Sequence, residues 1–382
     1  MAYFDNAATT YPKPECVYQD MDRIYRHAGG SAGRGLYLGS ASIGKLLQET
    51  RDYLKELLHC PGKEAIFTPT ATIALNMIIQ GLLKKGLRTV YITPFEHNAV
   101  TRVLYPYKLQ GNIRIRQLAF DEEEMSYDLA GIEADFQVHK PDLVIATHAS
   151  NVIGLISPIE KIFSLAKKHK AFTVADMSQT AGLVDIIVDD TFDFAVFAGH
   201  KTLYGPTGIS GFVMKPGIEL VPILYGGTGY ESANLAMPKQ LPERFEMGTM
   251  NSLGIAGLHA SLEWILETGI DNIWQQEQRH RERLLSILQN SYLLRLVGVN
   301  NNAEYVGIAS CIMGGIDTEN AGYLFTDRDI AVRSGLQCAP MAHEFMGTHP
   351  DGTVRFSTSY FTTDEDFRAL EDALNEIEFD LI

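Results

Sequence analysis

Short apolar runs alternate with amphipathic stretches between residues 64 and 215. Stretches with apolar residues at helical spacing, such as 71–85 and 157–170, separate the runs. Near-continuous apolar strands divided by helices are typical of a mostly parallel sheet with helices on both faces, so this pattern predicts an α/β fold. The runs predicted as strands are EAIFT (64–68), RTVYIT (88–93), DLVIAT (142–147), AFTVA (171–175), FDFAVFA (192–198) and ISGFVMK (209–215).

The chain beyond residue 251 has a different pattern. Residues 252–269 and 273–290 predict two long helices, the second with charged residues along one face. Shorter strand-like pieces and a closing helix are expected at residues 305–315, 330–335, 353–358 and 363–377. This order predicts a smaller α+β domain. A chain of 382 residues has room for two domains, and we place the boundary between residues 250 and 260.

Polar or ionisable side chains follow five of the predicted strands where each strand ends. In open α/β sheets, ligands bind outside the carboxyl ends of the strands. A single polar loop is ordinary, but five loops rich in Asp, His, Asn and Lys favour one shared ligand site. In chain order the residues are Thr70 and Thr72, then Glu96, His97 and Asn98, then His148, Ser150 and Asn151, then Asp176 and Gln179, and finally His200 and Lys201.

Composition and charge narrow the possible functions. The chain is 46% apolar with a net charge of −15, and it has no basic face for binding nucleic acid. No apolar run reaches the roughly 18–20 residues of a membrane helix, and the first residues lack the pattern of a signal peptide. The four cysteines are scattered without a C-x-x-C pair, and no metal site is expected. We therefore expect a cytoplasmic protein that binds neither nucleic acid nor membrane.

Lys201 and Asp176 each end an apolar strand and are the first candidates for chemistry. An apolar setting or a neighbouring cation lowers the pKa of a lysine amine and makes it a nucleophile. A pyridoxal phosphate (PLP) enzyme needs a lysine to hold the cofactor covalently and a carboxylate to keep its ring nitrogen protonated. Taken singly, Lys201 also fits a surface lysine at a strand end, and Asp176 also fits a helix N-cap. The Thr-rich turn at residues 70–72 fits either a phosphate site or a simple helix cap.

A series of short motifs resembles the class V aminotransferase family, in particular its cysteine desulfurase and selenocysteine lyase branch. The resemblance spans nearly the whole chain and implies the fold of fold-type I PLP enzymes. It implies a large PLP-binding domain (15–252) with a seven-stranded sheet, and a small domain (1–14 and 253–382). The motifs, in chain order, are YFDNAATTYPKP, TATIALN, EHNAV, THASNVIG, ADMSQTAG, FAGHKTLYGPTGISG, RFEMGTMN and VRSGLQCAP.

The resemblance implies PLP as cofactor and a role for each matching residue. Lys201 would hold the cofactor, Asp176 its ring nitrogen and Gln179 its phenolic oxygen, while His97 would stack on the ring. Phosphate would be bound by Ala71, Thr72, His200 and, from the partner subunit of a homodimer, Thr249. Asn151 would contact the substrate on the cofactor, and Arg355 would bind the substrate carboxylate with Arg333 nearby. Lys201, His97 and Cys338 would be catalytic.

Cys338 points to the reaction within this family. In the desulfurases that the chain resembles, a cysteine at this place takes sulfur from L-cysteine as a persulfide and L-alanine is released. A thiolate is the attacking form, and Arg333 would favour it. The other cysteines, Cys16, Cys60 and Cys311, match no catalytic position and are expected to be inert.

The resemblance therefore implies a PLP-dependent cysteine desulfurase, which often passes its sulfur to a protein acceptor. The alternatives are a selenocysteine lyase, another C–S lyase and a class V aminotransferase. The presence of Cys338 argues against the aminotransferase but not against the two lyases. A non-catalytic relative that keeps the fold is a further alternative. One residue departs from the family, because Ala198 replaces the usual Ser or Thr of [ST]-G-H-K and removes a hydroxyl from the expected phosphate site.

Overall fold

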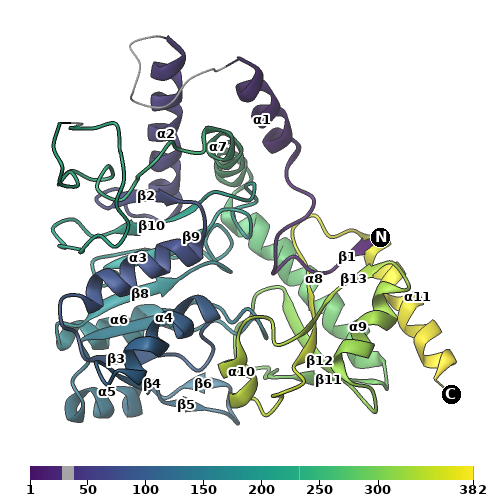
Figure 1. Ribbon diagram of the computed structural model, residues 1–382. Coiled ribbons are helices and arrows are strands. Elements are labelled where there is room, and N and C mark those ends of the chain that lie inside the picture. The colour runs from purple at the N-terminus through teal and green to yellow at the C-terminus, as the bar shows by residue number, and fades with distance from the viewer. Residues whose placement is uncertain (28–37, 232, 382) are drawn as a thin grey trace.

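The computed structural model describes residues 1–27, 38–231 and 233–381, and its largest element is a seven-stranded sheet (Figure 1). Its strand order is β2-β10-β9-β8-β7-β3-β4, and only β10 runs antiparallel to its neighbours. The mostly parallel sheet is thus confirmed. The strands are β2 (Glu64–Thr68), β3 (Thr89–Ile92), β4 (Arg114–Gln117), β7 (Leu143–Thr147), β8 (Phe172–Asp176), β9 (Phe194–Ala198) and β10 (Ser210–Met214).

All six predicted strands of this sheet are present, but β4 was missed. Its sequence is RIRQ, and none of its four residues is fully buried, since it lies at the sheet edge. An edge strand is half solvated and needs no apolar run. Because β4 is exposed, its sequence lacks the apolar run by which the other strands were predicted.

Helices cover both faces of the sheet and enclose a core on each side. Alternate residues of one strand belong to different cores: Ala65 and Phe67 pack in one, and Ile66 packs in the other. The first core includes residues of α2, α5, α6 and α7, and the second includes residues of α3 and α4. The helices of this part are α1 (Glu15–His27), α2 (Leu38–Leu57), α3 (Ala71–Leu83), α4 (Asn98–Leu109), α5 (Leu129–Val138), α6 (Ile159–Lys168) and α7 (Ser252–Thr268).

A second, antiparallel sheet with its own core lies beside the large one (Figure 1). Its order is β11-β12-β15-β14, formed by β11 (Leu294–Val297), β12 (Ile308–Met313), β15 (Thr353–Ser357) and β14 (Arg333–Gly335). The flanking helices are α8 (Ile270–Asn290), α9 (Thr318–Thr326) and α11 (Asp364–Asp380), so the expected α+β pattern and closing helix are present. The exact division of the chain into two domains stays a prediction.

The remaining elements are short. At the N-terminus, β1 (Ala2–Tyr3) pairs in parallel with β13 (Ile330–Ala331), which brings the first residues to the smaller sheet (Figure 1). A hairpin is formed by β5 (Phe120–Asp121) and β6 (Ser126–Tyr127). Helix α10 (Pro340–Phe345) begins two residues after Cys338. The N-terminus is therefore tied to a strand more than 300 positions away by sequence number.

We expect Gly211→Ala to destabilise the fold by about 3 kcal/mol, because overpacking a core forces the backbone to move. A Cβ atom at Gly211 would lie 2.1 Å from Ile66 O and 2.7 Å from Phe197 Cζ, where β10 meets its neighbours. Urea unfolding measures the change in the free energy of unfolding. Gly62→Ala is the matched control, since no atom lies within 4 Å of its added Cβ. Equal stabilities of the two variants would contradict this account.

Candidate active site

The carboxyl ends of the large sheet's strands surround a cavity of about 250 Å³. Parallel strands end at the same edge of a sheet, so their loops converge there. Eight of the nine residues predicted to bind cofactor line this cavity, and the exception is Thr249. The eight are Ala71, Thr72, His97, Asn151, Asp176, Gln179, His200 and Lys201.

Lys201 lies three residues beyond β9, with its side chain in the cavity wall. The pKa of its amine is lowered to about 8, chiefly by burial; the Asp176 carboxylate opposes this effect, while the cations Arg355 and Arg333 add to it. About a tenth of the amine is therefore neutral at pH 7, far more than for an ordinary lysine. The position gives a lysine that can act as a nucleophile and as a base.

The cofactor-free protein should show this shift directly. Because the neutral amine reacts, labelling of Lys201 by an amine reagent should rise with pH through a midpoint near 8. An ordinary lysine would show a midpoint near about 10.4. Asp176→Asn should move the midpoint lower, because the carboxylate favours the ammonium form. Peptide mass spectrometry across neutral and alkaline pH gives the rate, and an unshifted midpoint would contradict the assigned environment.

Asp176 is the last residue of β8 and is 7% exposed. Its Oδ1 accepts hydrogen bonds from the Ser178 N–H at 3.0 Å and the Ser178 Oγ–H at 2.6 Å. Turns, not a helix, follow Asp176, so the alternative interpretation as a helix cap is wrong. The carboxylate is held in place by its own loop and lines the cavity.

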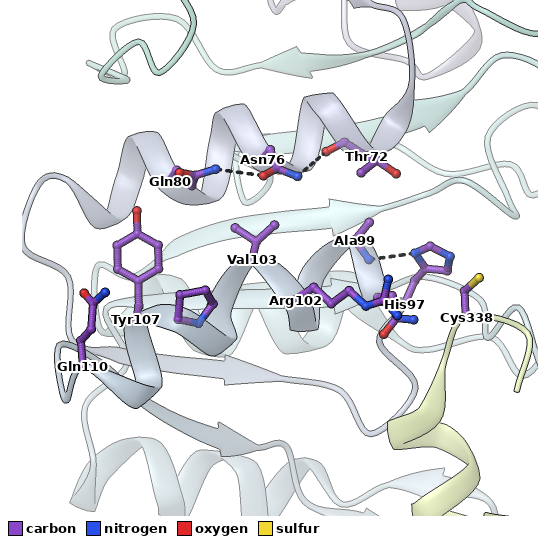
Figure 2. Close-up of a pocket in the computed structure, with 12 residues that line it drawn as sticks. Thr72, Asn76, Gln80, His97, Ala99, Arg102, Val103, Tyr107, Gln110 and Cys338 are labelled. Atoms are coloured by element: carbon purple, nitrogen blue, oxygen red, sulfur yellow. Dashed lines mark hydrogen bonds between the residues drawn. The ribbon is translucent and has the colours of Figure 1, made fainter. Parts of the chain in front are cut away.

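His97 is the N-cap of α4, and its ring lies on the side of the helix start where Cys338 is placed (Figure 2). Its Nδ1 accepts the Ala99 N–H at 2.9 Å, so the proton of a neutral ring is on Nε2. Burial, followed by the charge of Lys201, lowers the pKa of His97 to about 4. The imidazole is therefore neutral at pH 7, with an Nε2–H available as a donor.

Another part of the cavity wall, formed by the start of α3 and by His200, fits an anion. Ala71 and Thr72 open helix α3, whose N-cap Thr70 accepts the Ile73 N–H at 3.2 Å. Backbone N–H groups and the helix dipole favour negative charge at this point. His200 Nδ1 is buried and has no hydrogen-bond partner among the described residues. A phosphate placed here would meet these donors.

Cys338 is exposed and lies in the wall of a second cavity of about 650 Å³, which runs between α3 and α4 (Figure 2). Thr72, His97 and Ala99 line both cavities, so the cysteine stands next to the first one. The Cys338 carbonyl oxygen accepts the Asn98 N–H at 2.7 Å, which fixes the loop to the start of α4. The geometry brings the thiol close to His97.

The backbone at Cys338 is held in an uncommon conformation by its neighbour. Gln337 and Cys338 have φ angles of 39° and 59°, in the left-handed region. Gln337 is anchored at both ends: its carbonyl accepts from Asn151 Nδ2 at 2.7 Å, and its Oε1 accepts from His343 Nε2 at 2.8 Å. Such conformations persist where surrounding contacts impose them. No pattern in the sequence pointed to Gln337, because its contact with Asn151 joins segments that are distant along the chain.

The other cysteines are placed as expected. Cys60 and Cys311 are buried, and Cys16 is half-buried. Burial raises the pKa of Cys60 to about 11 and raises that of Cys311 further. Their thiols are therefore protonated at neutral pH and poorly nucleophilic.

Arg355 lies on β15 with a 2% exposed side chain and does not line either cavity. Its Nη1 donates to Asn151 O at 2.8 Å and its Nη2 donates to Asp5 Oδ1 at 2.7 Å. Arg333 is directly opposite it in the β14–β15 register and is exposed. Asp5 belongs to the N-terminal motif, but no local pattern indicated that it reaches Arg355.

Comparison with known protein families shows the family to which the chain belongs. Residues 2–370 match the Aminotransferase class-V family. The chain belongs to this family. Its members are PLP-dependent, and the large sheet with its helices is the fold-type I architecture.

Two relatives of this chain and one similar solved structure are named as cysteine desulfurases. A probable cysteine desulfurase from Pyrococcus abyssi is 30% identical over 98% of this chain and 94% of its own. A cysteine desulfurase from Escherichia coli O9:H4 is 29% identical over 99% of this chain and 93% of its own. The apo structure of cysteine desulfurase from Thermococcus onnurineus NA1 superposes with a TM-score of 0.90 and 28% identity, covering 98% and 94% of the two chains.

The residues of this family member fit PLP on two structural grounds. His200 Nδ1 and Asn151 Oδ1 are buried in the cavity wall without partners among the described residues, as expected of groups reserved for a ligand. The cavity also has a lysine, a carboxylate and a helix N-terminus in its wall. Lys201, Asp176 and the start of α3 are therefore the groups that would hold PLP.

At two positions of the family motifs, Ala198 and Thr249, the chain supplies no hydroxyl to this cavity. Ala198 lines the cavity and supplies no hydroxyl, while the hydroxyl-bearing residues Thr70, Thr72 and Ser178 line the same cavity. Thr249 lies elsewhere, in cavities with Arg51 and with Phe245. Its predicted contact with phosphate through a partner subunit stays a prediction.

Residues 1–27, 38–231 and 233–381 contain neither a membrane-spanning helix nor a cluster of metal ligands. None of the helices there is long and apolar enough to cross a bilayer. These residues also contain no group of three or more His, Cys, Asp or Glu that could hold a metal ion.

Proposed function

We propose that the protein is a PLP-dependent cysteine desulfurase. It would convert L-cysteine to L-alanine and keep the sulfur as a persulfide on Cys338. The observation that carries this proposal is the place of Cys338, exposed on a wall that shares Thr72, His97 and Ala99 with the Lys201 cavity. The names of the relatives support it.

The proposed mechanism assigns a task to each group in the cavity. Bound PLP supplies an electron sink that weakens bonds at the substrate Cα. Asp176 holds a proton on the ring nitrogen, and the N–H groups at the start of α3, with His200, bind phosphate. Lys201 Nζ, whose pKa is lowered to about 8, holds the cofactor and moves a proton at Cα. Arg355, which donates to the cavity residue Asn151, would bind the substrate carboxylate.

Sulfur transfer would take place at Cys338. The substrate's Cβ–S bond breaks and a new S–S bond forms to Cys338 Sγ, so that L-cysteine and the thiol give L-alanine and the persulfide. His97, which lines both cavities, would offer its Nε2–H as the proton donor. A second thiol, from a small molecule or an acceptor protein, then removes the outer sulfur and returns the Cys338 thiol.

We also propose a homodimer, a protein sulfur acceptor and a cytoplasmic location. Support for the homodimer comes from Thr249, which lies outside the cofactor cavity of its own chain. Exposed apolar side chains lie in the preceding segment, among them Leu224 (41%), Tyr225 (68%) and Leu235 (105%). A partner would cover such side chains. Light scattering of the purified protein tests the dimer.

The activity is tested by steady-state kinetics with L-cysteine and L-selenocysteine under a thiol reductant. Alanine formed in step with sulfide, from protein with bound PLP, is the expected result. A strong preference for selenocysteine would instead make the enzyme a selenocysteine lyase. No alanine from either substrate would overturn the proposal.

A further inference from the structure

Arg355, the proposed ligand for the substrate carboxylate, already has a carboxylate partner within the chain. Its Nη2 is 2.7 Å from Asp5 Oδ1, and its Nη1 is 2.8 Å from Asn151 O. Its Nε is buried and has no partner among the described residues. Two bonds on a 2% exposed side chain therefore set the orientation of the guanidinium plane and leave other N–H groups for a ligand.

Asp5 is itself fixed by the backbone on both sides. Phe4 N–H donates to Ala331 O at 2.9 Å, and Phe4 O accepts the Ser357 N–H at 2.7 Å. After Asp5, the Ala7 N–H donates to Ser357 Oγ at 2.8 Å. Asp5 also forms a bridge with Ser357, two residues after Arg355 on the same chain segment. The carboxylate is thus a rigid partner, built into the smaller sheet.

The segment that carries Asp5 continues to the cofactor cavity. Gln179 Nε2 donates to Ala7 O at 2.9 Å. Thr9 Oγ1 donates to His200 O at 3.0 Å, and Thr10 Oγ1 donates to Lys201 O at 3.0 Å. Residues 5–10 therefore connect the strand of Arg355 with the loop of Lys201. These hydrogen bonds therefore link the position of the Arg355 guanidinium to that of the Lys201 amine.

Charge gives a second reason for a carboxylate at this place. Arg355 faces Arg333 across the β14–β15 pair, and both cations act on Lys201. Asp5 is the carboxylate paired with Arg355. A buried arginine without a counter-charge is costly, and its side chain would turn toward another acceptor. Asp5 offsets that charge before substrate arrives.

We infer that Asp5 is a positioning residue for the proposed reaction: it holds the Arg355 guanidinium in the orientation that receives a substrate carboxylate. The inference rests on the proposed function, because it needs an amino-acid substrate bound through its carboxylate. Asp5 touches neither substrate nor cofactor in this account and acts through Arg355. It determines how well the site distinguishes an amino acid from an amine.

Calorimetry on the PLP-loaded enzyme tests this with two ligands that differ by one carboxylate, L-alanine and ethylamine. Asp5→Ala should weaken L-alanine binding about tenfold, because the guanidinium loses the charge-assisted hydrogen bond that orients it. Asp5→Asn should lose less, because its amide oxygen still accepts the Nη2–H. Ethylamine binding should not change. With L-cysteine, KM should rise by the same factor while kcat stays within about twofold, the signature of lost uniform binding.

Two further variants separate positioning from a structural role. Tyr3→Phe removes hydroxyl bonds to Asp5 O and Thr9 O in the same segment and leaves the ion pair, so it should bind L-alanine normally. In an Arg355→Ala enzyme, adding Asp5→Ala should not weaken L-alanine binding further. Further weakening there, or equal loss in Tyr3→Phe, would show that Asp5 only supports the segment and would overturn the inference.

The outcomes also separate this inference from the proposed function. An enzyme that desulfurates cysteine but binds L-alanine unchanged after Asp5→Ala overturns the role of Asp5 alone. An enzyme that makes no alanine but loses L-alanine affinity in the variants overturns the desulfurase proposal and keeps the role of Asp5. Wild-type enzyme that binds no L-alanine overturns the carboxylate site and Asp5 with it.

Discussion

Replacing Lys201 by alanine is expected to lower alanine formation from L-cysteine at least about 1,000-fold, equivalent to about 4 kcal/mol of transition-state stabilisation. The side chain lines the cavity, and burial lowers the pKa of its amine to about 8, so it is the group able both to hold PLP covalently and to move a proton. Removing it takes away both tasks. Steady-state kinetics and the absorbance of the bound cofactor measure the loss.

Lys201→Arg is the matched control for charge. It keeps a cation near Asp176, but a guanidinium remains protonated at any working pH and cannot replace the amine. Both variants should therefore be inactive to a similar extent, with the fold intact by circular dichroism. If Lys201→Arg kept a tenth or more of the activity, the lysine would act only through its charge.

Cys338→Ser should reduce steady-state alanine formation at least about 100-fold, or about 2.7 kcal/mol of transition-state stabilisation. A serine hydroxyl keeps the size of the side chain but is not a thiolate that can take up sulfur. L-alanine binding should persist, because Arg355 and the cofactor residues are unchanged. Mass spectrometry of wild-type enzyme after one turnover should show one added sulfur on the peptide that contains Cys338.

Cys16→Ser serves as the control, since Cys16 is the other cysteine that is not fully buried. It should keep normal turnover and carry no added sulfur. Undiminished desulfuration by Cys338→Ser under reductant would show that sulfur leaves the substrate without a persulfide on the protein. An added sulfur on Cys16 would place the acceptor elsewhere.

Sequence patterns were sufficient wherever burial is continuous along a segment. Strands β7, β8 and β9 are mostly apolar because helices cover both faces of the sheet, so their runs were recognisable. The ordered motifs then located the polar residues that follow those strands. Strand β4 was not predicted because it is an exposed edge strand. The same physical cause, burial or its absence, explains both the success and the failure.

The site was predictable where a residue stands at a strand end and unpredictable where it depends on distant partners. Asp176 and Lys201 follow from strand positions, since all parallel strands finish at one edge. Asp5 and Arg355 are 350 positions apart, and nothing local in either segment indicates their contact. Gln337 likewise depends on Asn151, which lies 186 positions away.

The sequence alone determined the alternation of strands and helices, the family resemblance and the identities of the reactive groups, because these depend on local pattern and residue type. Only the tertiary structure decided what surrounds those groups. It placed Cys338 in a left-handed turn fixed to α4, lowered the pKa of Lys201 by burial, and paired Arg355 with Asp5. Burial and ion pairing arise between segments that are remote in the chain, so no local pattern encodes them.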